Sequence, residues 1–138
     1  MPVTSNFDVT IRAFCGKSKA RVKKIQQLIA QKMLNEIVDL TPVDTGRAKG
    51  NWNVNESTPD ESYVWDKMEP SGSATKAAGA AKISQMSGKS IYITNGIPYM
   101  EFLEDGWSRT QAPAGITKVA LAMRDDIIDE ALRELGEA

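Results

Sequence analysis

Apolar positions in residues 18–40 recur at the spacing of one helical face. Successive apolar residues are three or four positions apart: Val22, Ile25, Ile29, Met33, Ile37 and Leu40. This period predicts an amphipathic helix. Ser18 is its expected N-cap, because a serine hydroxyl can accept a hydrogen bond from a free first-turn amide. Pro42 should end the helix, because it disfavours helical geometry at Thr41.

A second amphipathic pattern predicts a helix from Ala114 to Leu135, with apolar residues at four-residue steps. Between the two helices, alternation over Asn51–Asn55 predicts a half-buried strand. The β-branched and aromatic segment Ser90–Thr94 predicts another strand, closed by the turn residues Asn95 and Gly96. Ser62–Trp65 is a candidate third strand, and Tyr99–Leu103 is expected to form one helical turn.

Residues 69–90 differ in composition from the rest of the chain. Fourteen of these 22 residues are Ser, Gly, Ala or Thr. An Ala-rich helix over 74–86 would lack a strong apolar face, so we interpret 69–90 as a mobile insert that leaves the core between two strands. The whole pattern predicts one α+β domain over residues 1–138. Its small antiparallel sheet is packed by a long N-terminal helix and a long C-terminal helix.

The composition excludes several kinds of chemistry. The chain has no histidine, and Cys15 is its single cysteine. Ser-His-Asp and Cys-His catalysis, imidazole metal ligation and an intrachain disulfide therefore cannot occur. We expect a protein that is not an enzyme and that needs no metal or cofactor. The sequence shows neither a signal peptide nor an apolar run of membrane-spanning length, so we expect synthesis in the cytosol.

Charge is unevenly distributed along the chain. Residues 1–50 hold nine Lys/Arg and four Asp/Glu, a net charge of +5, whereas residues 51–138 hold eight and fourteen, a net charge of −6. The asymmetry suits contacts between unlike faces of identical subunits. Taken alone, however, it is more typical of two solvated faces that differ in sign.

Two other patterns leave alternative functions open. Five cations lie at the start of the first helix, where the helix dipole disfavours positive charge: Lys17, Lys19, Arg21, Lys23 and Lys24. They would suit a nucleic acid or an acidic partner, and they are equally typical of a solvated basic helix end. Glu101, Glu104 and Asp105 follow a strand and could form a metal-dependent hydrolase or nuclease site. The sequence places no second carboxylate group near them by motif, so we favour a structural or interface role.

The most informative segments are two loops rich in turn formers, Leu40–Trp52 and Ile91–Tyr99. Loops of this kind are costly to order and are frequently presented to a partner. Trp52 lies on an alternating strand and is expected in the core. Trp107 stands in a loop between Gly106 and Ser108, where a large aromatic side chain is a favourable interface anchor.

These two loops, together with the segments Leu103–Ser108 and Gln111–Gly115, resemble segments of the neck and tail-completion proteins of tailed bacteriophages. This group includes the minor tail protein Z family of lambdoid phages. The matched segments span residues 40–115 and have the order and spacing that they have in the family. The sequence departs from the family at Met100, where alanine usually follows Pro-Tyr, and this change should affect local packing only.

The resemblance implies a non-enzymatic virion protein. Such a protein forms a ring, commonly sixfold, that completes the tail and joins it to the head connector, with DNA passing along the axis. The implied partners are other copies, a connector or adaptor protein, and a tail-tube or terminator protein. The implied interface residues are Arg47, Trp52, Tyr99, Glu104 and Trp107. The implied loop-shaping residues are Asp44, Thr45, Gly46, Asn95 and Pro98.

Overall fold

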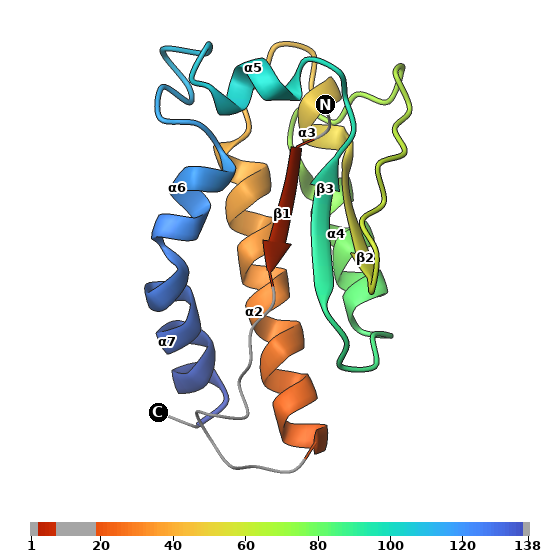
Figure 1. Ribbon diagram of the computed structural model, residues 1–138, viewed down its shortest axis with the longest axis vertical. Coiled ribbons are helices and arrows are strands. Elements are labelled where there is room, and N and C mark those ends of the chain that lie inside the picture. The colour runs from red at the N-terminus through yellow and green to blue at the C-terminus, as the bar shows by residue number, and fades with distance from the viewer. Residues whose placement is uncertain (1–2, 8–18, 137–138) are drawn as a thin grey trace.

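A three-stranded antiparallel sheet packs against a long helix in the computed structural model, which describes residues 3–7 and 19–136 (Figure 1). The strands are β1 (Val3–Phe7), β2 (Trp52–Glu56) and β3 (Ile91–Asn95). The helices are α2 (Lys19–Leu40), α3 (Arg47–Gly50), α4 (Ser73–Ile83), α5 (Met100–Glu104), α6 (Thr117–Ala122) and α7 (Arg124–Glu134). The predicted α+β class is confirmed. Ser18 and Cys15, by contrast, lie outside the described residues.

The strands lie in the order β1-β3-β2. The register pairs Trp52 with Asn95 and Val54 with Ile93. The central strand is therefore the one that the sequence indicated most clearly. The edge strand β1 was not predicted from the sequence, because a polar run, Thr4–Asn6, separates its two apolar residues, Val3 and Phe7.

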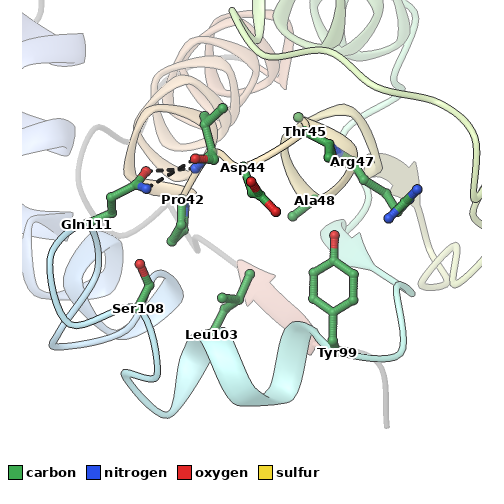
Figure 2. A pocket seen from close by; sticks show the side chains of 11 residues that line it. Pro42, Asp44, Thr45, Arg47, Ala48, Tyr99, Leu103, Ser108 and Gln111 are labelled. Carbon is green, nitrogen blue, oxygen red and sulfur yellow. Dashed lines mark hydrogen bonds between the residues drawn. The ribbon is translucent and has the colours of Figure 1, made fainter.

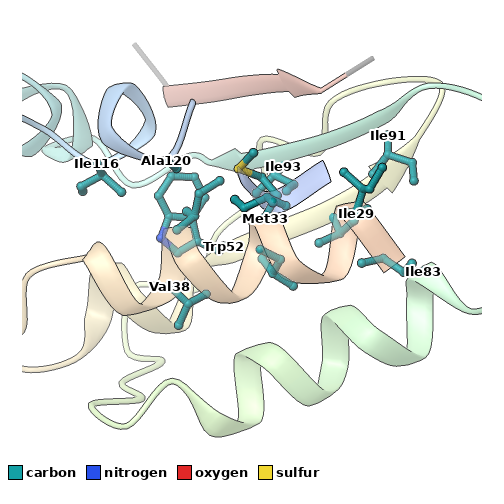
Figure 3. Packing of buried hydrophobic residues seen from close by; sticks show 14 of the residues in the cluster. Ile29, Met33, Val38, Trp52, Ile83, Ile91, Ile93, Ile116 and Ala120 are labelled. Atoms are coloured by element: carbon teal, nitrogen blue, oxygen red, sulfur yellow. The ribbon is translucent and has the colours of Figure 1, made fainter. Parts of the chain in front are cut away.

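Helix α2 is the centre of the hydrophobic core. Its predicted apolar face is fully buried at Ile25, Ile29, Met33 and Ile37. In Figure 3 the helix lies between the sheet and α4, with Met33 directed towards Ile93. The helix also packs against α6 and α7. The helix ends at Leu40, as predicted from Pro42.

The segment 69–90 does not leave the core as we expected. It contains α4, which packs against α2 and β2 and buries Thr75, Gly79 and Ile83. Gly79 is the reason for this close approach, since a Cβ atom there would lie 2.1 Å from the Cδ2 atom of Leu34. A helix with a weak apolar face can therefore pack tightly, because the missing side chain lets the two backbones come together.

The expected strand at Ser62–Trp65 is wrong. This segment is irregular and runs beside β2. Asparagine side chains form its hydrogen bonds, in place of backbone pairing between strands. The side-chain nitrogen of Asn51 donates to the carbonyl oxygen of Val64 at 3.1 Å, and its side-chain oxygen accepts from the backbone amide of Val64 at 2.8 Å. Asn53 Nδ2 donates to the Ser62 carbonyl oxygen at 2.6 Å. These side chains satisfy the loop backbone, so regular pairing is not needed.

The predicted single helix over residues 114–135 is also wrong in detail. The helical segment begins at Thr117, after Pro113 and the positive φ of Gly115 (+91°), and is divided into α6 and α7. The division falls at Met123, whose amide bonds to the carbonyl oxygen of Ala120 three residues earlier. Such a tighter turn rotates the following helix relative to the first.

Candidate interaction site

A cleft of about 300 Å³ lies between the loop that follows α2 and the segment around α5. Figure 2 shows Asp44 on one wall, with Tyr99 and Leu103 directed towards it from the other. Residues from both informative loops and from the segment after α5 line it: Pro42, Val43, Asp44, Thr45, Gly46, Arg47, Ala48, Tyr99, Leu103, Ser108 and Gln111. The fold thus brings together segments that are more than fifty residues apart in the sequence.

Gly46 fixes the turn that forms the first wall. Its φ is +87°, a conformation in which side chains are strained. A Cβ atom at this position would also lie 2.4 Å from the backbone nitrogen of Pro70. The Gly46 carbonyl oxygen accepts hydrogen bonds from the amides of Gly50 and Glu69, each at 2.9 Å. The turn is therefore fastened both to α3 and to the chain segment that leads into α4.

Asn95 joins the end of β3 to α3. Its buried amide donates to the Ala48 carbonyl oxygen at 2.7 Å, and its side-chain oxygen accepts from the Ile97 amide at 3.1 Å. Thr45 accepts a hydrogen bond from the Arg47 amide at 3.3 Å. Pro98 is exposed on the short segment between β3 and α5. The hydrogen bond between Asn95 and Ala48 therefore connects the two loops that line the cleft.

Gln111 closes the far side of the cleft with a pair of hydrogen bonds. Its side-chain oxygen accepts from the Val43 amide at 2.7 Å, and its side-chain nitrogen donates to the Val43 carbonyl oxygen at 3.1 Å. The primary amide thus pairs with a peptide group as another peptide would. Gln111 belongs to one of the resembling segments, but no role was predicted for it, because nothing in the local pattern shows which backbone a glutamine will meet.

Arg47 was expected at an interface, but its side chain is engaged within the chain. Its guanidinium carbon lies 4.1 Å from the centre of the Trp65 ring, and its Nε atom donates to the Trp65 carbonyl oxygen. The Trp65 ring in turn meets Tyr99 edge-on, with 6.0 Å between ring centres. This stack of cation and aromatic rings connects the irregular loop to the rim of the cleft.

Trp52, which we expected in the core and also at or beside an interface, is a core residue. Its side chain is 4% exposed. Its indole nitrogen donates to the Thr41 hydroxyl at 2.8 Å. The expectation of a core position, which came from the alternating strand pattern, is the one that the structure supports.

Glu104 caps α6 from inside the chain. One carboxylate oxygen accepts from the amides of Ile116 and Thr117, and the other accepts from the Thr117 hydroxyl and the Lys118 amide, at distances of 2.6–3.2 Å. Both carboxylate oxygens of Glu104 are therefore already engaged in hydrogen bonds within the chain. Within residues 3–7 and 19–136, no group of three or more acidic or Cys side chains could hold a metal ion.

The same end of the molecule exposes large aromatic side chains. Trp107 is 69% exposed and Phe102 is 46% exposed, and their ring centres lie 4.6 Å apart. On the loop beside β2, four more apolar residues are exposed: Tyr63, Val64, Trp65 and Met68. Exposed apolar clusters of this kind are common where proteins bind other macromolecules.

Three polar groups face the cleft without a partner among the described residues. They are the Asp44 carboxylate, the Tyr99 hydroxyl and the Ser108 hydroxyl. All three can accept a hydrogen bond, and the carboxylate also has negative charge at neutral pH. The cleft therefore offers acceptors and a negative charge beside the apolar side chains of Pro42, Ala48 and Leu103.

No family model, curated protein or solved structure matches this chain. The helices of the described part are all too short or too polar to cross a lipid bilayer.

Proposed function

We propose that this protein is a structural subunit of the neck or tail of a tailed bacteriophage. Copies of the chain form a ring, commonly of six, that completes the tail and joins it to the head connector. The protein catalyses no reaction and needs no cofactor. It works through contacts with other copies, with the connector or adaptor and with the tail-tube or terminator protein, while DNA passes through the ring without specific binding.

The observation that supports this function best is the position in the fold of the segments that resemble the phage family. Those around Asp44, Tyr99, Trp107 and Gln111 come from separate parts of the sequence and meet at one end of the molecule, around α3 and α5 (Figure 1). An end built from such loops is suited to binding a partner.

The exposed aromatic pair supports the same interpretation. Phe102 and Trp107 present a large rigid apolar surface next to the cleft. Burying such a surface between subunits contributes much of the free energy of binding, because aromatic side chains lose little rotational freedom. Carboxylate chemistry is less favoured, since the Glu104 oxygens already accept bonds from backbone amides.

Complementation of a phage that lacks this gene tests the proposal. We expect filled heads and separate tails without the gene, and joined particles when the wild-type gene is supplied. Trp107→Ser should fail to restore joining. Leu121→Ser is the matched control, because Leu121 is also exposed (41%) but lies on α6. Normal particles in the absence of the gene would refute the proposed function.

A further inference from the structure

We propose that the cleft around Asp44 in one copy of the chain receives the Arg109 side chain of a second copy. This inference rests on the proposed function, because it names a contact through which copies assemble. It concerns two side chains that form no hydrogen bond or ion pair with any described residue.

The receiving side has the chemistry of a guanidinium site. A guanidinium group has five N–H donors and no acceptor, and it pairs with a carboxylate through two parallel hydrogen bonds. The cleft offers the unpaired Asp44 carboxylate, and the hydroxyls of Tyr99 and Ser108 are further acceptors. The apolar side chains beside them suit the methylene stem of an arginine.

The donating side is Arg109, on the loop between α5 and α6. Five arginines lie in the described residues, and four of them have a partner within the chain. Arg47 stacks on Trp65, Arg124 lies 3.8 Å from Asp125, and Arg21 and Arg133 donate to backbone carbonyl oxygens. Arg109 alone has no hydrogen bond or ion pair with any described residue.

The surroundings of Arg109 favour a second copy as the partner. Trp107 is two residues away and is 69% exposed, so a contact made by this loop would also bury a large aromatic surface. Excluding water around an ion pair strengthens it. The loop after α2, which carries Asp44, and the loop between α5 and α6, which carries Arg109, lie at the same end of the molecule (Figure 1). The two residues form no ion pair with each other, so both remain able to pair between copies.

Exchanging the two charges tests the contact. Sedimentation velocity over a range of concentrations would compare the wild type, Asp44→Arg, Arg109→Asp and the double variant. Each single variant should weaken self-association by about tenfold or more, as expected for a close interfacial ion pair. The double variant should recover most of this loss. A mixture of the two single variants should also associate, because each supplies the charge that the other lacks.

The controls separate this inference from the proposed function. Arg124→Asp reverses an exposed charge on α7 and should leave self-association unchanged. Asp44→Asn and Arg109→Gln are milder variants that remove charge if a reversal disturbs folding. If the wild type associates and these neutral variants associate equally well, the contact is wrong but the proposed function stands. If the wild type stays monomeric at every concentration, the contact is refuted, and the complementation experiment alone decides the proposed function.

Discussion

The indole nitrogen of Trp52 donates a hydrogen bond to the hydroxyl oxygen of Thr41 at 2.8 Å, in the buried region where α2 ends. The same hydroxyl donates to the carbonyl oxygen of Ile37 at 2.7 Å. One small side chain thus satisfies the last turn of α2 and the polar atom of a buried tryptophan on β2. This link connects the end of α2 to β2, next to the loop that forms the first wall of the cleft.

We predict that Thr41→Val lowers the free energy of unfolding by about 1–3 kcal/mol, because it leaves the buried indole N–H without an acceptor. Valine has nearly the same shape, so packing changes little. Urea denaturation followed by circular dichroism measures the difference. Thr41→Ser keeps the hydroxyl and should be less destabilising. Equal stability of the valine variant and the wild type would show that the hydrogen bond is unimportant.

Gly79→Ala should destabilise the protein, although alanine favours helices by about 1 kcal/mol over glycine. The new Cβ atom would overlap the Leu34 side chain, and overpacking of this kind costs about 1–3 kcal/mol. Thermal unfolding of the variant is the measurement. The control Ala78→Gly changes the neighbouring exposed position and should show only the propensity loss. An increase in stability for Gly79→Ala would contradict the close packing of α4 on α2.

Asn51→Asp should loosen the loop beside β2. The side-chain Nδ2 atom of Asn51 donates to the carbonyl oxygens of Arg47, Val64 and Lys67. A carboxylate cannot donate to any of them. We expect a loss of about 2 kcal/mol or more and faster hydrogen exchange at the Val64 amide. Asn55→Asp is a milder control near the other end of β2. Unchanged exchange at Val64 would contradict the role of Asn51.

Glu56 should make the stability depend on pH. Burial of the carboxylate, the largest influence, raises its pKa, but hydrogen bonds from the amides of Ser87 and Lys89 and from the Ser87 hydroxyl together outweigh it. The pKa is held below the usual 4.5. A lowered pKa in the folded state means that the stabilisation is present at neutral pH and is lost as the pH falls through the folded-state pKa.

Denaturation of the wild type and Glu56→Gln at several pH values measures this effect. The wild type should be more stable near neutral pH, and the difference should shrink below about pH 4.5. Ser87→Ala removes only the hydroxyl donor, so its loss at neutral pH should be smaller. A difference that stays constant over the whole range would show that the ionised carboxylate is not the source of the stabilisation.

The elements that the sequence predicted well are those whose apolar pattern is local. Helix α2 shows a clear period, and burial of its apolar face follows directly from it. Strand β3 is rich in β-branched residues, which favour a strand locally. The docking of α4 depends on the absence of a side chain at Gly79, which a hydrophobic pattern does not register. Ser62–Trp65 has the residue types of a strand, but its backbone is satisfied by asparagine side chains, so local propensity was misleading.

The sequence indicated two of the loops that line the cleft, but not the contacts that they make. The loops around Asp44 and Tyr99 were identified from their turn formers, and the fold brings them to one cleft. The stacking of Arg47 on Trp65 and the pairing of Gln111 with Val43 join residues far apart in the sequence. Contacts of this kind depend on tertiary geometry, which the spacing of residues along the chain does not contain.

Electron cryomicroscopy of the intact phage particle tests most directly whether the chain acts by assembling with copies of itself and with other virion proteins. We predict a ring of this fold between head and tail, with Trp107 and the cleft around Asp44 buried between subunits. A junction filled entirely by other chains, or a ring in which this end of the molecule faces solvent, would contradict the account.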